Sequence, residues 1–258
     1  MVITVHDMVP EIRPMDFKHP EKVHPGKHLL CEQADGIIAV SYNTKADLVK
    51  YFGISQDKIE VIYHGTPKLI IKDRPSGISA THKYILFVGY REGYKNFANA
   101  ALAAAAIMNK DKELHLIALG GGDFKSAQLE PFKRMNCDDR VHQISAPDED
   151  MGMYYANAEV FVYPSLYEGF GLPILEAFAC RCPVVLSNCS CFPEIAAEAA
   201  LYFDPLDPDM IKDALHRILC DRSLRNRMIA KGIQRARDFS IREEVNKLID
   251  FYRRLLRS

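Results

Sequence analysis

The sequence lacks any strong charge imbalance and any long apolar run. These absences exclude several classes of function. Lys and Arg number 33 against 34 Asp and Glu, which removes a global electrostatic attraction to nucleic acid. No apolar stretch reaches the ~20 residues that a membrane-spanning helix requires. The first residues, MVITVHDMVPEIRP, lack the basic and then apolar layout of a signal peptide. We therefore expect a cytoplasmic protein without nucleic-acid partners.

The sequence also lacks an even set of cysteines. It has seven in 258 residues, which favours reduced thiols in a cytosolic compartment. Cys180, Cys182, Cys189 and Cys191 form two C-x-C pairs, and four thiolates can bind zinc. Their spacing departs from the usual zinc knuckle, and a predicted buried strand lies between the pairs. Buried reduced thiols are the favoured interpretation.

Hydrophobic residues make up 48% of the sequence, enough for a substantial core. Apolar strand-like segments alternate with helix-like segments along the chain. Strands are predicted at residues 2–5, 36–40, 58–63, 84–88, 114–119, 141–144, 159–163 and 183–186, and helices at 44–52, 96–108, 124–135, 148–157, 173–179 and from 240 onward. Ser240 with Glu243 three residues later predicts a capping box for the last helix. The alternation predicts an α/β fold with parallel sheets covered on both faces, and residues 64–82 are expected to be a linker.

One segment combines two carboxylates with a glycine-rich turn. Residues 167–177 read YEGFGLPILEA, in which Glu168 and Glu176 bracket glycine, proline and apolar side chains. The segment follows a predicted strand, and Pro173 suits the first position of the next helix. A helix N-terminus at the carboxyl end of a parallel strand favours a diphosphate, and the glycines permit its close approach. Spacing alone leaves open a purely structural turn with an acidic first helical turn.

The wider stretch YPSLYEGFGLPILEAFACRCPVV resembles the glutamate-seven-glutamate signature of retaining glycosyltransferases of the GT-B fold, family 4. The resemblance implies one Rossmann-like domain that is complete and another that is partial. It also implies that Glu168 lies by the donor sugar and that Glu176 binds the ribose of the nucleotide. The loop that holds the diphosphate would then consist of Gly169, Phe170, Gly171 and Leu172.

Three other segments extend the resemblance. ILFVGYREGYKNF resembles the first strand and loop of the nucleotide domain, which implies Gly89 beside the nucleotide and Arg91 and Lys95 at the pyrophosphate. SAPD, beginning at Ser145, is similar to the loop that borders the base. ITVHDMVPE is similar to the end of a strand in the other domain, which implies His6 near the reaction centre. From this stretch alone, solvated loop cations would be the favoured interpretation of Arg91 and Lys95.

A metal-dependent reaction is disfavoured by the sequence. Asp148, Glu149 and Asp150 form a D-x-D motif, which binds a metal–diphosphate in another glycosyltransferase fold. The motif starts a predicted helix, so Asp148 is interpreted as an N-cap. No metal or other cofactor is expected, and the nucleotide-diphosphate sugar is treated as the donor substrate.

The chain departs from the family in its length. Family members usually carry roughly a hundred more residues before the position of His6, about half a typical domain. We expect residues 1–77 to be a partial N-terminal domain and linker, 78–236 a nucleotide-sugar-binding domain, and 237–258 a C-terminal helix that packs back towards the N-terminal part. The open sheet edge predicts self-association or a partner chain that completes the domain.

The resemblance implies transfer of a mannose-like hexose from a GDP- or UDP-linked donor to a saccharide or lipid-linked acceptor, with retention. The alternative is a nucleotide-sugar-binding remnant or a subunit of a split enzyme, inactive alone. Residues 222–258 contain eleven Lys or Arg and four Asp or Glu. This basic stretch fits either peripheral contact with an anionic membrane or solvated helix faces.

Overall fold

The computed structural model describes residues 1–19, 22, 26–71 and 82–257. Within these residues the chain forms a three-stranded sheet, order β1-β2-β3, and a six-stranded sheet, order β6-β5-β4-β7-β8-β9. All pairings are parallel, which confirms the predicted α/β class. The strands are β1 (Val2–Val5), β2 (Gly36–Ala39), β3 (Ile59–Val61), β4 (Lys83–Val88), β5 (Leu114–Leu119), β6 (Val141–Ile144), β7 (Val160–Tyr163), β8 (Val184–Ser187) and β9 (Leu201–Phe203).

Helices connect these strands, as parallel pairing requires. They are α1 (Val9–Ile12), α2 (Lys27–Gln33), α3 (Tyr42–Phe52), α4 (Phe97–Lys110), α5 (Ser126–Arg134), α6 (Met151–Asn157), α7 (Leu172–Ala179), α8 (Phe192–Ala196), α9 (Pro208–Cys220), α10 (Arg222–Arg237) and α11 (Ile241–Leu255). Within the described ranges, no helix has the length and apolarity needed to span a bilayer.

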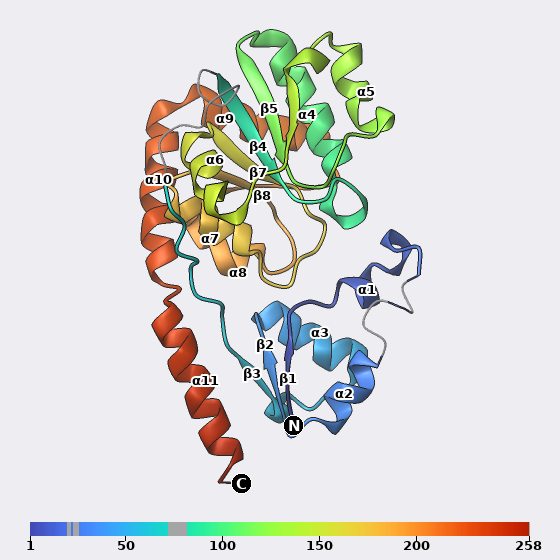
Figure 1. Ribbon diagram of the computed structural model, residues 1–258, viewed down its shortest axis with the longest axis vertical. Helices are drawn as coiled ribbons and strands as arrows, with labels where there is room; N and C mark the ends of the chain where they lie inside the picture. The colour runs from blue at the N-terminus through green and yellow to red at the C-terminus, as the bar shows by residue number, and fades with distance from the viewer. Residues whose placement is uncertain (20–21, 23–25, 72–81, 258) are drawn as a thin grey trace.

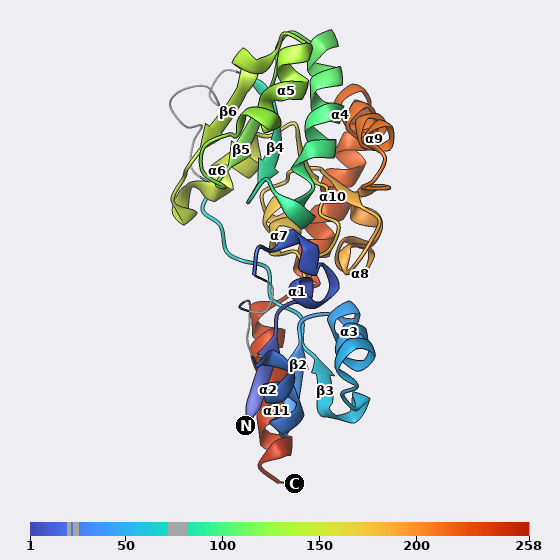
Figure 2. The ribbon, with the colours of Figure 1, turned by 90° about the vertical axis from the view of Figure 1, so that its right-hand side faces the viewer.

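The larger sheet is buried on both faces (Figures 1 and 2). Phe87, Val162 and Val185 pack towards α4 and α9 on one face, whereas Phe161, Tyr163 and Leu186 pack towards α7 and α8 on the other. The strand order reverses direction between β4 and β7, and open sheets of this kind bind ligands at the carboxyl ends of the strands flanking such a point. The loops after β4 and β7 therefore frame the candidate site.

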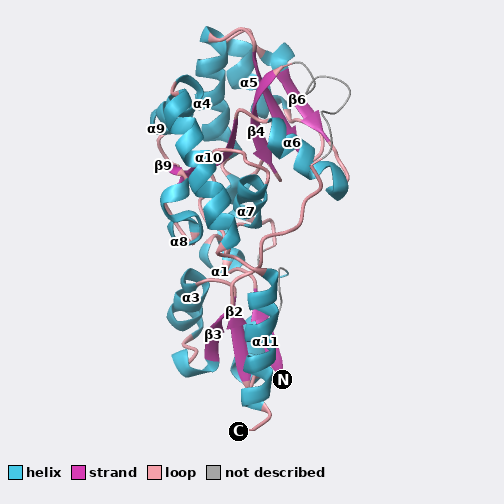
Figure 3. Cartoon of the chain, turned by 90° about the vertical axis from the view of Figure 1, so that its left-hand side faces the viewer, coloured by secondary structure: helices cyan, strands magenta, loops and turns pink. Residues whose placement is uncertain are grey.

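The smaller sheet lies between helices from both ends of the chain (Figure 3). Ile37 and Ala39 of β2 belong to an apolar cluster that includes Leu48 of α3, whereas Ile38 packs with Phe251 of α11 on the opposite face. The predicted linker is described only in part: residues 72–81, with the expected domain boundary at 77 and 78, lie outside the described residues.

Three local predictions were wrong. Residues 148–150 form a 3-10 turn that is preceded by Pro147, and the cap position of α6 itself is occupied by Asp150, not Asp148. The capping box at Ser240 is not formed among the described residues; instead the Glu244 carboxylate accepts the Gly65 amide at 2.8 Å and lies 3.0 Å from His64 Nδ1. This long-range contact engages Glu244, the residue that follows the predicted cap partner Glu243, with residues 64–65.

The third correction concerns the helix after the glycine turn. α7 begins at Leu172, so Pro173 is its second residue, and Glu176 lies just beyond its first turn. The physical reason is Gly171, whose φ of +88° is a left-handed conformation that only glycine adopts without strain and that lets the helix start one residue earlier.

Candidate functional site

The loop between β7 and α7 is fixed by contacts with its own domain. Ser190 Oγ donates to the Glu168 carbonyl and accepts the Glu168 amide at 3.1 Å, and the Cys191 thiol donates to the same carbonyl at 3.2 Å. These contacts pin the Glu168 backbone on the loop after β8. The Glu168 carboxylate is left to project towards the loop after β4.

The Glu168 carboxylate pairs with Lys95 across the point where the strand order reverses. Lys95 Nζ lies 2.7 Å from Glu168 Oε1 and 3.4 Å from the Tyr163 hydroxyl. Both charged side chains are largely buried, which strengthens their attraction relative to an exposed pair. The structure thus joins a cation and a carboxylate from separate loops at the carboxyl edge of the sheet.

Gly169 lies where a loop of the larger sheet meets a loop of the smaller sheet. A Cβ built on Gly169 would lie 1.8 Å from the His6 carbonyl oxygen and 2.8 Å from the Asp7 Cα, so only glycine fits. The Gly169 carbonyl accepts hydrogen bonds from Ser41 Oγ at 2.6 Å and Thr44 Oγ1 at 3.2 Å. The α3 N-terminus and the end of β1 therefore hold the loop that carries Glu168.

His6 lies beside this loop at the carboxyl end of β1. Its ring stacks on His64 with centroids 5.4 Å apart and planes 11° from parallel. Partial burial, with the neighbouring His64, lowers the pKa of His6 despite the opposing effect of Asp7. A lowered pKa keeps the imidazole neutral at pH 7, so it can accept or donate a proton.

Phe170 is placed differently from the other members of the loop. Its ring packs edge-on against His64 at 5.2 Å and contacts Tyr63 and Phe239, in an aromatic cluster between the two sheets. The side chain is 4% exposed, so it stabilises the junction of the two halves. Its backbone remains part of the predicted diphosphate loop.

Glu176 lies in α7 and contacts a buried tyrosine. The Tyr155 hydroxyl donates to Glu176 Oε2 at 2.9 Å. Burial, with the charge of Asp148, raises the pKa of Glu176, although the Tyr155 hydrogen bond opposes the rise. Asp148 follows β6 in the loop that contains the exposed Ser145, so Glu176 lies near that loop, whereas Glu168 pairs with Lys95 of the loop after β4.

The Arg91 side chain is buried against the glycine turn that follows β5. Its guanidinium donates to the carbonyls of Gly120 (2.6 Å), Gly121 (3.3 Å) and Gly122, and it packs over the Phe124 ring at 4.3 Å. The side chain is 5% exposed. In this structure Arg91 therefore orders the glycine turn after β5, and the alternative reading of a solvated loop cation is wrong.

The remaining predicted residues flank the same edge. Gly89 follows β4 with a φ of +109°, and a Cβ there would approach Lys95 Cε at 3.9 Å. Leu172, the first residue of α7, is 37% exposed. Gly89 thus permits the turn that brings Lys95 to Glu168, and Leu172 presents its backbone amide at a helix start.

The four clustered cysteines are structural. Cys180, Cys182 and Cys191 are buried and Cys189 is half-buried. Cys189 Sγ donates to the Leu166 carbonyl at 3.3 Å. In the described part of the chain, no three His, Cys, Asp or Glu side chains are arranged to hold a metal ion.

Sequence reasoning missed the groups that hold the glutamates in place. Tyr155, Ser190 and the pair Ser41 and Thr44 each fix one part of the loop or its carboxylates. Ser41 had a detectable signal, since serine just before a helix is a common N-cap, and its Oγ accepts the Thr44 amide. Tyr155 carried no such signal, because its partner is 21 residues away.

Comparison with known proteins identifies the family. The model of "Glycosyl transferases group 1" matches residues 70–235, and that of "Glycosyltransferase Family 4" matches residues 1–67. O-antigen chain mannosyltransferase B of Escherichia coli is 30% identical over 98% of this chain and 70% of its own length. O-antigen chain mannosyltransferase RfbU of Salmonella typhimurium is 27% identical over 84% of this chain, but only 60% of its own length is matched.

Solved structures support the same assignment. Sucrose-phosphate synthase from Thermosynechococcus elongatus superposes with a TM-score of 0.79 at 25% identity, covering 99% of this chain and 67% of that one. HepE of Anabaena, solved in complex with UDP and glucose, has a TM-score of 0.76 at 18% identity and covers 97% of this chain and 70% of its own. The chain therefore belongs to the group 1 glycosyltransferases, family 4, of the GT-B fold.

Proposed function

We propose that this chain binds a nucleotide-diphosphate sugar and transfers its hexosyl group, mannose-like, to a saccharide or lipid-linked acceptor with retention of configuration. The observation that carries the proposal is the buried Lys95–Glu168 pair beside the start of α7. Mannosyltransferases of O-antigen chains among the relatives support the choice of sugar. The experiment below distinguishes a GDP-linked donor from a UDP-linked donor.

In the proposed arrangement, the diphosphate lies at the amides of Gly171 and Leu172, where the helix dipole favours negative charge. As the bond between the anomeric carbon and the diphosphate oxygen breaks, Lys95 stabilises the charge that develops on the leaving group. Glu168 orients the sugar, and the acceptor hydroxyl attacks from the face that the leaving group vacates, passing its proton to the departing diphosphate oxygen. Glu176 accepts hydrogen bonds from the ribose hydroxyls.

Arg91 has a different role in this proposal from the one the resemblance implies. Its donors are taken by the carbonyls of residues 120–122, so it positions the glycine turn that borders the diphosphate. His6 borders the acceptor side, where its neutral imidazole faces the Glu168 loop. The proposal assigns no step to a metal ion.

A second candidate function rests on the length of the relatives. The matched region spans 70% and 60% of the two O-antigen enzymes, so a sizeable part of each lies outside the match. The same site is compatible with a chain that binds the nucleotide sugar but transfers the sugar only together with a further polypeptide. Binding without donor hydrolysis or transfer favours this candidate.

Thermal-shift measurements with GDP-mannose, UDP-glucose, UDP-N-acetylglucosamine and an ADP-sugar test the proposal. A ligand that binds only the native state stabilises it by RT ln(1 + [L]/Kd), about 2.7 kcal/mol at a hundredfold excess over Kd. We expect one donor to raise the melting temperature and Glu176→Ala to reduce that rise. Glu130→Ala, at an exposed carboxylate of α5, serves as the control. No shift with any nucleotide sugar would refute the proposal.

A further inference from the structure

His64 is a histidine beside the candidate site that the proposed function does not use. It lies between β3 and the larger domain, is half-buried, and contacts three segments that are distant in sequence. Its ring stacks on His6 at the end of β1, meets the edge of the Phe170 ring at 5.2 Å, and lies 3.0 Å from the Glu244 carboxylate of α11. His64 thus joins the end of β1 to the loop that carries Glu168.

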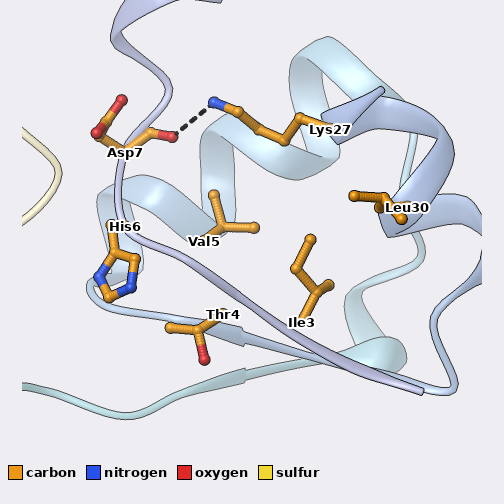
Figure 4. A pocket seen from close by; sticks show the side chains of 7 residues that line it. All are labelled: Ile3, Thr4, Val5, His6, Asp7, Lys27 and Leu30. Carbon is orange, nitrogen blue, oxygen red and sulfur yellow. Dashed lines mark hydrogen bonds between the residues drawn. The ribbon is translucent and has the colours of Figure 1, made fainter. Parts of the chain in front are cut away.

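The alternation of side chains along β1 places His6 on the face of the sheet that α11 covers. Val2 packs with Phe251 of α11, whereas Val5 belongs to the apolar cluster on the opposite face. Figure 4 shows the same alternation at the end of the strand: the His6 ring lies on one side of the chain, and Val5 and Lys27 lie on the other. His6 therefore meets the segment after β3 on the α11 face.

The Glu244 carboxylate fixes His64 through contacts with two adjacent residues. Its Oε1 lies 3.0 Å from His64 Nδ1, and its Oε2 accepts the Gly65 amide at 2.8 Å. The start of α11 packs closely on this segment, since a Cβ at Gly65 would lie 2.5 Å from the Ile241 backbone. A carboxylate beside one ring nitrogen orients an imidazole and favours the proton on that nitrogen. The ring that stacks on His6 is therefore held in one orientation.

The groups around His6 act on its charge in opposite directions. Partial burial and the neighbouring His64 lower the pKa of His6, whereas Asp7 raises it. The other titratable groups near the two rings are Glu11 and Lys27 on the β1 side and Tyr63, Asp238, Glu243, Glu244 and Lys247 on the α11 side. With centroids 5.4 Å apart, the stacked rings oppose a second positive charge. A neutral imidazole can accept a hydrogen bond from a sugar hydroxyl, whereas an imidazolium cannot.

We propose that His64, oriented by Glu244, is a positioning residue for His6: it holds the His6 ring beside the loop of Glu168 and keeps that ring uncharged during transfer. This inference rests on the proposed function, in which the neutral His6 borders the acceptor. Because His64 acts through His6, its loss should change the rate of transfer and the pH dependence of that rate. Nucleotide affinity should not change, since it depends on Glu176 and the start of α7.

Titration of the His6 ring by NMR tests its charge without any ligand, and the loss of a signal in His6→Gln identifies the ring. His64→Gln removes the stacked ring, and His64→Phe keeps a ring that carries no charge. In each variant the pKa of His6 should rise by at least about 0.5, because a like charge within ~6 Å no longer opposes protonation. His28→Gln is the matched control: it removes a histidine stacked on Phe52 at 4.5 Å and should leave the pKa of His6 unchanged.

Transfer kinetics test the consequence for the reaction. Protonation of His6 should lower kcat as the pH falls, and in both His64 variants this loss should begin at a pH higher by the same amount as the pKa of His6. Glu244→Ala frees the His64 ring and should lower kcat by about ten- to a hundredfold, the cost of misplaced groups, with the nucleotide Kd within about threefold. Glu243→Gln, at the exposed neighbour in the same turn of α11, should match the parent in both quantities.

An unchanged pKa of His6 in the His64 variants, or a parent-like kcat in Glu244→Ala, would overturn the proposal. So would equal losses of kcat and nucleotide affinity, because the substitutions would then disturb the whole site. Either His64 variant suffices for the titration if the other does not fold. The titration needs neither donor nor acceptor, so its failure leaves the proposed function standing. Absence of nucleotide-sugar binding, in turn, refutes the proposed function and leaves the titration unaffected.

Discussion

Lys95 Nζ lies 2.7 Å from Glu168 Oε1, with only 15% and 13% of the two side chains exposed. The pair joins the loop after β4 to the loop after β7, across the point where the strand order reverses. A carboxylate held this way cannot leave its cation without cost, because a buried unpaired charge is strongly destabilised. The pair therefore fixes both groups at the site where the proposed leaving charge develops.

Glu168→Gln keeps the shape of the side chain and removes its charge. We expect the rate of transfer, or of donor hydrolysis, to fall by about 10²–10³ because the sugar loses its orienting carboxylate while Lys95 loses its partner. Affinity for the nucleotide alone should stay within about threefold. Steady-state kinetics and calorimetry with the matching nucleoside diphosphate measure the two quantities.

Glu159→Gln is the matched control, since Glu159 is also partly buried and paired with an arginine, Arg225, but lies at the start of β7 far from the loops. Its turnover should equal that of the parent chain. Equal losses in the Glu168 and Glu159 variants would show that any ion pair of the larger domain has this effect.

The raised pKa of Glu176 predicts a pH dependence. Burial favours the protonated carboxyl in the folded state, so the folded protein binds more protons than the unfolded one between the ordinary and the raised pKa. Stability should therefore fall as the pH rises from about 4.3 through the raised value. Glu176→Gln cannot ionise, so it should flatten this part of the curve and be relatively more stable at pH 7.

Melting temperatures of the two forms at pH 4 and pH 7 measure this difference. Nucleotide binding should respond in the opposite sense, because the ribose hydroxyls need the ionised carboxylate as acceptor. Binding should thus strengthen as the pH rises through the same window and be weak at both pH values in Glu176→Gln. Parallel pH profiles of stability in the two forms would contradict the assignment.

The sequence predicts the strands and the strand-to-helix turn of the site because both depend on local patterns of residues. The apolar runs at 84–88 and 114–119 are buried strands within one residue of their predicted bounds, since their pattern is local. Glu168, Gly169 and Gly171 lie in the predicted strand-to-helix turn for the same reason. What the sequence did not predict was set by partners distant in sequence: the Arg91 contacts with residues 120–122, the packing of the Phe170 ring against Phe239, and the contact of Glu244 with residues 64–65.

Two neighbouring glycines of the turn that Arg91 contacts should differ in how much stability an alanine substitution costs. Gly120 and Gly121 both have left-handed φ values, +78° and +72°. A Cβ on Gly120 would meet nothing within 4 Å, whereas one on Gly121 would lie 2.7 Å from the Gly89 carbonyl and 2.9 Å from Arg91 Nη1. Gly120→Ala should therefore cost about 1–2 kcal/mol of backbone strain, and Gly121→Ala should cost about 1–3 kcal/mol more through the steric clash.

Urea denaturation followed by circular dichroism measures both free energies of unfolding. Because the clash involves Gly89, Gly121→Ala should also shift the loop that carries Lys95 and weaken donor binding, whereas Gly120→Ala should leave binding close to that of the parent. Equal destabilisation by the two substitutions would mean that Arg91 does not hold the turn as described.

Because Gly169 lies against the His6 carbonyl, we expect that a single methyl group added at residue 169 will push the Glu168 loop away from the end of β1. A Cβ at residue 169 would lie 1.8 Å from the His6 carbonyl, and that carbonyl belongs to a backbone that cannot rotate aside. Gly169→Ala should thus displace the loop from β1 and break its hydrogen bonds with Ser41 and Thr44. Hydrogen exchange should accelerate in the first turn of α3 and remain unchanged in β4 and β5.

Gly232→Ala provides the control for this substitution. Its Cβ would lie 2.6 Å from the Phe178 ring, so it disturbs packing wholly inside the larger domain. It should lower the melting temperature without changing exchange in α3. For Gly169→Ala we expect nucleotide affinity to be kept, because α7 and Glu176 lie in the larger domain, while transfer falls by about a hundredfold, the cost of misplacing reacting groups by about 1 Å. Normal transfer in Gly169→Ala would show that the reaction does not need His6 and Glu168 held together.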